Sequence, residues 1–229
     1  MDKTALIIGT SRGLGLALAA AYLDRGWRVI GTVRGNARTG LHDLADRSDG
    51  RLDIETLDVT EPDQLVALRQ RLAGRRLDLL FVNAGIATNV GQPIGQVPTK
   101  DFTRLMATNA LAPMRALELL EDLVPPTGTI GVMSSHLGSV TENEDGAWAA
   151  YASSKAALNM LMRGFAARRA PDPRAMIVMA PGWVRTEMGG ETATLSVEES
   201  IPRVVDVLQA AAGTGGLRFL DYTGRTVAW

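Results

Sequence analysis

The chain has 229 residues, 46% of them hydrophobic and 21% charged, a composition typical of one globular domain with a sizeable core. The net charge of −1 argues against nucleic-acid and membrane-surface binding, which require a concentrated basic patch. The absence of cysteine excludes disulfides, thiolate metal ligands and cysteine nucleophiles, and only two histidines, His42 and His136, are available to a metal. Because the chain shows neither a signal peptide nor a long apolar run, we expect a cytoplasmic protein with no metal site and no membrane contact.

The first predicted unit is a strand, a glycine-rich turn and a helix. Residues 4–8 are apolar, as in a strand buried on both faces, and the helical pattern after the turn stops at Gly26. Free N–H groups at a helix N-terminus bind anions, so the turn is a candidate phosphate site. A tight turn that uses glycine only for close packing is the alternative. The candidate cofactor-binding residues of this turn are Gly9, Ser11, Arg12, Gly13, Leu14 and Gly15.

The end of the second predicted strand, residues 27–33, distinguishes the two nicotinamide cofactors. An acidic residue here would hydrogen-bond the ribose 2′-hydroxyl of NAD, but the chain continues Arg34-Gly35-Asn36 without a carboxylate. Arg12 and Arg34 could together hold a 2′-phosphate through charge-assisted hydrogen bonds. We therefore expect a preference for NADP(H), with NAD(H) possible. The alternative is that both arginines are solvated surface residues.

The next two predicted strands end in polar or small residues. The strand at 51–57 precedes Asp58-Val59-Thr60, and Thr60 is expected to cap a helix at 61–73. The strand at 77–82 precedes Asn83-Ala84-Gly85. Ligands lie beyond the carboxyl ends of the strands in an open parallel sheet, and small residues let them approach the backbone. Asn83 could instead be only a turn residue.

A loop at 86–98 leads into a long helix at about 99–123, which Pro113 is expected to break or kink. Asn109 lies in the middle of this helix, although its amide competes for backbone groups and disfavours helix interiors. A local conflict of this kind is typical of functional sites, so Asn109 is a candidate site residue.

The fifth predicted strand, 128–134, is followed by Ser135, and a further helix is expected to begin at Tyr151. Tyr151 and Lys155 are four positions apart and therefore lie on one face of that helix, one turn apart. Taken alone, the pair also fits an amphipathic helix with a half-buried tyrosine and a surface lysine. Ser139 is nearer to Tyr151 in sequence, but we favour Ser135 because the strand end fixes its position.

The remaining pattern completes an α/β fold. A strand at 175–180 precedes Pro181-Gly182, Ser196 and Glu199 read as a capping box for a helix at 197–212, and the tail holds a last strand. We therefore predict a single Rossmann domain over residues 1–229, with a doubly wound parallel sheet of about seven strands flanked by helices.

These motifs together resemble the short-chain dehydrogenase/reductase family from end to end. The glycine-rich turn is similar to the family's T-G-x-x-x-G-x-G, with Ile8 in place of the usual Thr. Ser134-Ser135 with Gly138 matches S-S-x-x-G, although the distance to Tyr151 is slightly longer than the commonest one. The segments SSHLGS, YASSKAALN, PGWVRTEMGG and FLDYTGRTVAW resemble the C-factor-like branch, which includes sniffer-type carbonyl reductases.

The resemblance implies a catalytic role for four residues. Tyr151 would be the general acid in carbonyl reduction, with Lys155 as its electrostatic partner and ribose anchor. Ser135 would hold the carbonyl oxygen, and the backbone carbonyl of Asn109 would hold a water that leads to Lys155. Lys155 and the cationic oxidised nicotinamide are expected to lower the Tyr151 pKa from its usual value of about 10.

The resemblance also implies the rest of the cofactor site. Asp58 would meet the adenine amino group, Val59 would flank the ring, and Thr186 would bond the nicotinamide carboxamide. Residues 187–196 would form a flexible substrate loop, and pairing through helices around 100–123 and 151–169 would give a homodimer or homotetramer. The further cofactor-binding residues implied in this way are Asn83, Ala84, Gly85, Tyr151, Lys155, Pro181, Gly182 and Val184.

The function implied is that of an NADP(H)-dependent oxidoreductase of the carbonyl reductase type. It would transfer a hydride between the nicotinamide and a small-molecule carbonyl or alcohol. The alternative is an NAD(P)-binding signalling or regulatory protein of the C-factor type with little or no turnover. Such a binding protein would have no need of Ser135 and Tyr151 together.

Overall fold

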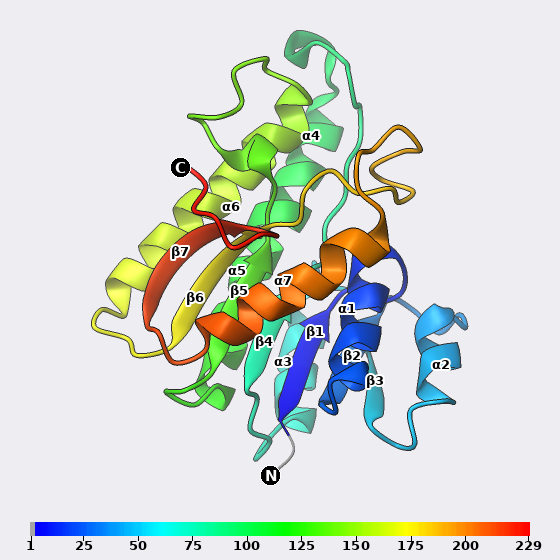
Figure 1. The fold of residues 1–229 in the computed structure, drawn as a ribbon. Helices are drawn as coiled ribbons and strands as arrows, with labels where there is room; N and C mark the ends of the chain where they lie inside the picture. Colours follow the sequence, from blue (N-terminus) through cyan, green and yellow to red (C-terminus); the bar gives the residue numbers. More distant parts are fainter. Residues whose placement is uncertain (1–2) are drawn as a thin grey trace.

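Seven parallel strands form one sheet in the order β3-β2-β1-β4-β5-β6-β7 (Figure 1). The computed structural model describes residues 3–229. The chain begins in the middle of the sheet, extends outward to β3 and then crosses to β4 on the other side of β1, so the strand order reverses between β1 and β4. Ligands bind at such a reversal in open α/β sheets. The strands are β1 Thr4–Ile8, β2 Arg28–Val33, β3 Leu52–Thr56, β4 Leu79–Val82, β5 Thr129–Met133, β6 Ala175–Ala180 and β7 Gly216–Asp221.

The central strands are buried on both faces, which explains their unbroken apolar sequences. β1 pairs with β4 so that Leu6 lies opposite Leu80. Because side chains alternate along a strand, Leu6 and Ile8 enter the core on one side of the sheet, and Ala5 and Ile7 enter the core on the other. The predicted α/β fold with a seven-stranded, doubly wound parallel sheet is confirmed.

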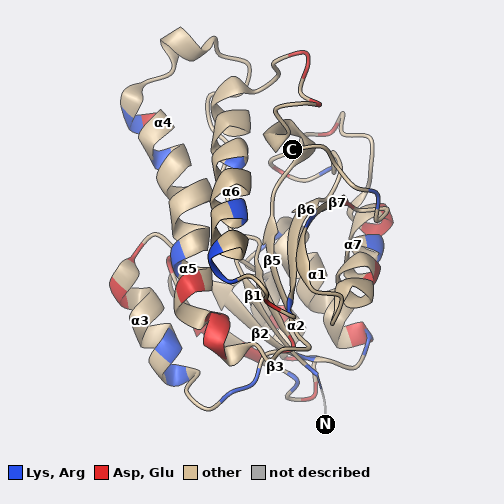
Figure 2. Ribbon diagram, turned by 90° about the vertical axis from the view of Figure 1, so that its left-hand side faces the viewer, with Lys and Arg blue, Asp and Glu red and all other residues tan. Residues whose placement is uncertain are grey.

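Helices cover both faces of the sheet (Figure 1), and Figure 2 shows α3 to α6 on one side and α1 and α7 on the other. The first layer packs through residues such as Leu68, Leu117 and Phe165. The second packs through Tyr22 and Val204. Within residues 3–229, none of the helices has the length and apolar character of a membrane span. The helices are α1 Gly13–Asp24, α2 Gly40–Ala45, α3 Pro62–Arg71, α4 Thr99–Met106, α5 Ala112–Leu120, α6 Ala149–Arg168 and α7 Val197–Ala211, with short 3-10 turns at Ile94–Gln96, Glu121–Leu123 and His136–Gly138.

The long helix predicted at 99–123, with a break or kink around Pro113, is interrupted just before that residue. A π-helical turn, Ala107–Leu111, separates α4 from α5 and contains Asn109. Pro113 lies in the first turn of α5, where a missing N–H costs little. It cannot donate to the carbonyl of Asn109 four residues earlier, so this carbonyl lacks its α-helical partner.

Three predicted helix starts have different outcomes. The capping box of Ser196 and Glu199 is confirmed, with Ser196 Oγ accepting from Glu199 N at 3.1 Å. Thr60 was wrongly predicted as a cap, because Glu61 takes that position and the Thr60 hydroxyl donates to Asp58 Oδ1 at 2.6 Å. Tyr151 does not open its helix either, since α6 begins at Ala149.

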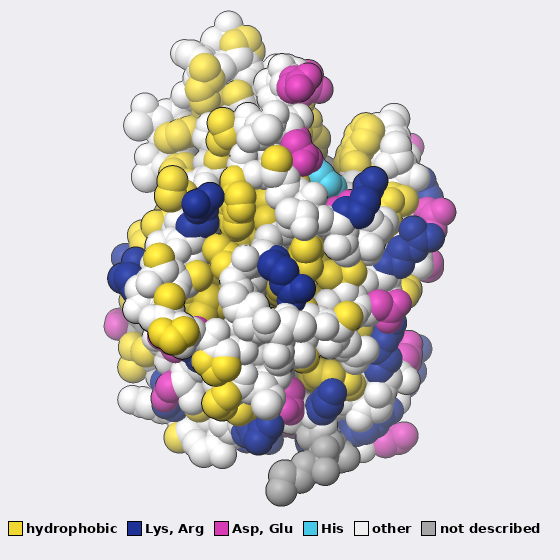
Figure 3. Space-filling model, turned by 60° about the vertical axis from the view of Figure 1, so that its left-hand side comes forward, with side chains coloured by type: hydrophobic (Ala, Val, Ile, Leu, Met, Phe, Trp, Pro, Cys, Tyr) yellow, Lys and Arg dark blue, Asp and Glu magenta, His cyan; other side chains and the backbone are white. Residues whose placement is uncertain are grey.

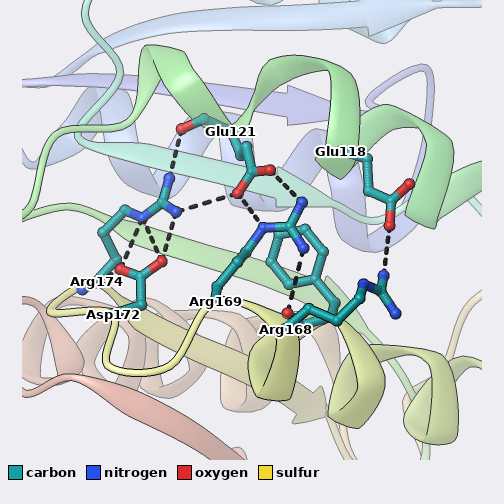
Figure 4. A network of polar contacts seen from close by, with 7 residues as sticks. Glu118, Glu121, Arg168, Arg169, Asp172 and Arg174 are labelled. Carbon is teal, nitrogen blue, oxygen red and sulfur yellow. Dashed lines mark hydrogen bonds and ion pairs between the residues drawn. The ribbon is translucent and has the colours of Figure 1, made fainter.

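A network of ion pairs joins the end of α5 to the end of α6 and the segment before β6 (Figure 4). The Glu121 carboxylate accepts from Arg169 Nε at 2.5 Å and from Arg174 Nη2 at 3.1 Å. Arg174 also pairs with Asp172, and its hydrogen bond holds the Asp172 pKa below the usual value. The Glu121, Arg169 and Arg174 side chains are only 17%, 22% and 14% exposed, so losing one partner would leave charges poorly solvated.

Glu121→Gln is expected to lower the free energy of unfolding by about 2 kcal/mol, because two guanidinium groups lose their anionic acceptor in a partly buried place. Glu118→Gln is the matched control. Its pair with Arg168 is exposed, so the loss should stay below about 0.5 kcal/mol. Denaturant titration of both variants measures the difference, and equal losses would contradict this role for Glu121.

Candidate active site

The glycine-rich turn after β1 packs directly on the segment that follows β4. Asn83 Nδ2 donates to the Gly9 carbonyl at 2.8 Å, and the N–H groups of Asn83 and Ala84 both donate to the Ile8 carbonyl. A Cβ on Gly15 would lie 1.9 Å from the Gly9 carbonyl oxygen, and one on Gly9 would lie 2.8 Å from the Ala84 nitrogen. These backbone approaches require glycine, and they bring two distant motifs together where the strand order reverses.

Two threonines that the sequence analysis did not single out hold this turn against β2. Thr32 Oγ1 accepts from Gly9 N at 2.9 Å, and Thr10 Oγ1 donates to the Thr32 carbonyl at 2.9 Å. Both side chains are buried. A polar residue inside the apolar second strand was the only signal that could have pointed to Thr32.

The outer part of the turn forms the N-terminal end of α1. Gly13, at φ 57°, begins the helix and has open space where a Cβ would stand. Ser11 is half-buried, and Leu14 packs partly against the core. The Arg12 guanidinium is exposed and forms an ion pair with Glu187, a residue of the loop after β6.

Arg34 and Asp58 lie near each other at the ends of β2 and β3. Burial acts to raise the Asp58 pKa, but the hydrogen bonds from Thr60 and the charge of Arg34 outweigh it, so the pKa lies below its usual value. Asp58 is therefore a carboxylate near neutral pH. The neighbouring Val59 side chain is buried in the core.

Asn109 ties the segment after β4 to α6. Its Oδ1 accepts from Ile86 N and its Nδ2 donates to the Ile86 carbonyl, both at 2.8 Å. The same Nδ2 donates to Ser154 Oγ at 3.0 Å. Gly85 lies against this junction, since a Cβ there would be 3.4 Å from Asn109 Oδ1 and 3.3 Å from Lys155 Nζ. Ser154 was missed in the sequence, because its importance depends on a partner 45 positions away.

Tyr151, Lys155 and Ser135 meet at the carboxyl end of β5. Lys155 Nζ donates to the Met133 carbonyl at 2.9 Å and lies 5.6 Å from the centre of the Tyr151 ring. The Ser135 side chain lies beside the Tyr151 hydroxyl and acts to lower its pKa, and Ser135 Oγ accepts from Leu137 N at 3.2 Å. The structure thus brings the three predicted side chains into one cluster, in which Tyr151 and Lys155 are buried and Ser135 is half-buried.

Burial controls the protonation of this cluster. It raises the pKa of Tyr151 to about 12, an effect that the hydrogen bond from Ser135 only partly offsets. It lowers the pKa of Lys155 to about 8. We expected Lys155 to help lower the Tyr151 pKa, but within the protein alone burial is the larger effect. Near neutral pH, Tyr151 is therefore a neutral proton donor and Lys155 is mostly cationic.

Ser139, the alternative to Ser135, has a different environment. It is 1% exposed, and its Oγ accepts from Glu142 N at 3.0 Å within the loop that precedes α6. A second buried contact nearby joins Ser134 Oγ to Asn159 Oδ1 at 2.7 Å, and Asn159 Nδ2 donates to the Gly138 carbonyl at 3.0 Å. These contacts hold the turn after β5 against α6.

The segment after β6 folds back on itself at the same edge of the sheet. The Pro181 carbonyl accepts from Ser200 Oγ at 2.7 Å, and Gly182 adopts φ 83°, where a Cβ would lie 2.5 Å from the Leu195 side chain. Val184 is buried and bridges to Leu195. Thr186 Oγ1 accepts from Gly189 N at 3.1 Å. This short segment therefore contains four of the cofactor residues that the resemblance implies: Pro181, Gly182, Val184 and Thr186.

The chain is similar in sequence and structure to several known proteins. Residues 3–195 match the short chain dehydrogenase family. The structure has a TM-score of 0.98 with a short-chain dehydrogenase/reductase from Burkholderia multivorans solved with bound NADP, at 57% identity over 100% of both chains. It has a TM-score of 0.87 with the carbonyl reductase Sniffer of D. melanogaster, at 29% identity over 100% of both chains. The C-signal of Myxococcus xanthus is 33% identical over 155 residues, which cover 67% of this chain and 93% of that protein.

The chain therefore belongs to the short-chain dehydrogenase/reductase family of oxidoreductases. The similarity to C-signal and to Sniffer confirms the predicted relationship to the C-factor-like, sniffer-type branch.

The different environments of Ser135 and Ser139 give a prediction for catalysis. Ser135→Ala is expected to lower turnover about 100-fold, because it removes the hydroxyl beside Tyr151 that we expect to hold the carbonyl oxygen of the substrate. The turnover of Ser139→Ala should stay within about threefold of the wild-type value, because the Ser139 hydroxyl accepts a hydrogen bond from the loop backbone and lies outside the Tyr151 cluster. Steady-state kinetics of both variants test this ranking, and the reverse order would show that the wrong serine has been chosen.

Proposed function

We propose that the protein is an NADP(H)-dependent carbonyl reductase that transfers a hydride between the nicotinamide and a small-molecule carbonyl or alcohol. The observation that carries the proposal is the cluster at the end of β5, in which Lys155 lies beside the ring of the buried Tyr151 and Ser135 lies beside the Tyr151 hydroxyl. Membership of the family and the similarity to a relative solved with bound NADP support it.

The glycine-rich turn fits a dinucleotide. The open space over Gly13 and the free N–H groups at the start of α1 suit a phosphate, and the close packing of Gly9 and Gly15 keeps side chains out of the way. Arg12 and Arg34 suit a 2′-phosphate, and no carboxylate follows Val33 to repel it. The residues proposed to hold the cofactor are Gly9, Ser11, Arg12, Gly13, Leu14, Gly15, Arg34, Asp58, Val59, Asn83, Ala84, Gly85, Tyr151, Lys155, Pro181, Gly182, Val184 and Thr186.

Each catalytic residue then has a defined task. When bound, the nicotinamide supplies or accepts the hydride. In reduction, the carbonyl carbon gains the hydride and its oxygen gains a proton from Tyr151, which burial keeps protonated near neutral pH. Ser135 holds the carbonyl oxygen, and the Lys155 cation stabilises the tyrosinate that remains. The Asn109 carbonyl, which Pro113 leaves without its α-helical donor, suits an acceptor in a water-linked proton path to Lys155.

A signalling or regulatory role without turnover is the second candidate, and the similarity to C-signal favours it. A binding protein gains nothing from burying a lysine and a tyrosine together, because burial of an ionisable group destabilises its charged form. The buried Tyr151–Lys155 pair therefore favours the enzyme.

We also propose that the protein forms a homodimer or homotetramer. Leu111, Met160 and Leu161 are large apolar residues on the outer layer of helices and are 44%, 67% and 42% exposed. They are distributed over the two helical segments through which we predicted pairing. A cytoplasmic location stays a prediction from the sequence.

Tyr151→Phe tests the proposed chemistry. It keeps the buried ring and removes only the hydroxyl, so the melting temperature and cofactor affinity should change little while reduction falls about 100- to 10,000-fold. Turnover with NADPH and a carbonyl substrate measures this. A variant that keeps a tenth or more of the wild-type rate would exclude Tyr151 as the proton donor.

The two arginines predict the choice of cofactor. Two partly exposed charge-assisted contacts are expected to favour NADPH over NADH by roughly ten- to a thousandfold. Arg34→Ala should weaken the binding of NADPH and leave the affinity for NADH nearly unchanged. Added salt should partly reduce the preference for NADPH. Arg38→Ala is the matched control, because Arg38 is an exposed arginine paired with Asp43 and Asp46. Fluorescence titration of the wild type and both variants with each cofactor measures all six affinities. NADH binding as tightly as NADPH to the wild type would refute this interpretation of the second strand.

A further inference from the structure

The backbone of Trp148 has a conformation that tryptophan rarely adopts. It precedes α6 with φ 53° and ψ 46°, in the left-handed region. In the described chain, the other non-glycine residues with positive φ are Asp49 and Asn89, whose short polar side chains tolerate it. For a bulky residue the conformation costs about 1–2 kcal/mol. Strain of this kind is concentrated at functional sites, and Trp148 lies three positions before Tyr151.

The indole of Trp148 contacts the catalytic tyrosine directly. The two ring centres are 5.7 Å apart and the planes meet at 72°, an edge-to-face arrangement. The Lys155 ammonium lies 5.6 Å from the centre of the same tyrosine ring. Trp148 is half-buried, so the residue stays partly accessible to solvent beside Tyr151.

The loops at the carboxyl edge of the central strands, after β4, β5 and β6, each expose large hydrophobic side chains. In Figure 3, hydrophobic side chains occur on the projections at the top of the molecule, where acidic side chains and a histidine also lie. An exposed apolar surface next to a catalytic group indicates a ligand site. The residues are Val90, Ile94, Val140, Trp183 and Met188.

Two of the three carboxylates of the loop before α6 are engaged within the protein, and the third, Glu144, is exposed. Glu142 Oε1 accepts from Ala228 N at 2.8 Å, and Asp145 Oδ1 accepts from Ala147 N at 3.1 Å. We therefore base the inference about the substrate on the half-buried indole and the exposed hydrophobic side chains of the loops.

We propose that Trp148 determines substrate specificity by forming an aromatic wall beside Tyr151, and that the enzyme favours carbonyl compounds with a bulky aromatic or apolar group. The inference rests on the carbonyl reductase function proposed above. It accounts for the retained strain, because the left-handed residue 148 precedes α6 and carries the indole that packs against Tyr151.

The test compares two diketones that differ only in a phenyl or methyl group, 1-phenyl-1,2-propanedione and 2,3-butanedione. Trp148→Asn removes the indole but tolerates the left-handed backbone, and Trp148→Phe keeps an aromatic ring. The wild type should favour the phenyl compound in kcat/KM by tenfold or more, within the 10- to 200-fold range of an apolar pocket. Trp148→Asn should lose most of that preference, while its kcat/KM for 2,3-butanedione stays within threefold of the wild-type value. Trp148→Phe should keep a large part of the preference for the phenyl compound.

Asp49→Asn is the matched control, because Asp49 has the same backbone conformation in the loop before β3. It should change neither the preference nor the melting temperature. An equal loss for both diketones in Trp148→Asn, or an unchanged preference, would overturn the specificity role.

Equilibrium binding of the two diketones separates this inference from the proposed function. A wild type that binds the phenyl compound more tightly through Trp148 but turns over neither diketone would refute the reductase and support the aromatic wall. Turnover of the diketones together with a binding preference that does not depend on Trp148 would support the reductase and refute the aromatic wall.

Discussion

The hydrogen bond from the Lys155 ammonium to the Met133 carbonyl is the contact on which the active site depends. An ammonium that is 3% exposed is costly unless a fixed acceptor satisfies it, and the acceptor here is the last residue of β5. The contact therefore sets the position of α6 along the sheet. Once it is fixed, Tyr151 lies one turn earlier on the same face of α6, and Ser135 lies two residues beyond the acceptor, just after the strand ends.

A second set of contacts joins this cluster to the cofactor side of the sheet. Asn83 holds the Gly9 carbonyl. Three residues later, the Asn109 side chain binds the backbone of Ile86 and also reaches Ser154 on α6. Each link joins a buried or half-buried polar group to a defined partner, so the contacts favour a single arrangement. These hydrogen bonds, together with the short segment 83–86, position the glycine-rich turn relative to α6 at the point where the strand order reverses.

The sequence predicted the parts of this design that depend on local pattern. Apolar runs such as β1 and β6 identify buried strands, Gly9 and Gly15 mark a turn without side chains, and the spacing of Tyr151 and Lys155 fixes their common face. It did not predict the π-helical turn around Asn109 or the partners of Ser154, because these depend on atoms far away in the sequence. It also did not predict that burial raises the Tyr151 pKa in the protein alone, since spacing identifies a charged neighbour but does not measure burial.

Trp148 illustrates the same limit. Nothing in the residues around it favours a left-handed backbone, and the reason for the conformation is visible only in its contact with Tyr151. The ion pairs of Glu121 are the opposite case. They stabilise the far ends of α5 and α6 and have no part in the chemistry, so they can be altered without disturbing the site.

The central claim is that Lys155 is a buried cation with a strongly lowered pKa. The chain has three lysines, Lys3, Lys100 and Lys155, so an NMR titration of labelled lysine side chains resolves each of them. The structure predicts one signal with a pKa of about 8 that disappears in Lys155→Met. If instead the signal lost in Lys155→Met titrates near the ordinary lysine value of about 10.4, the ammonium is solvated and the account of the site is wrong.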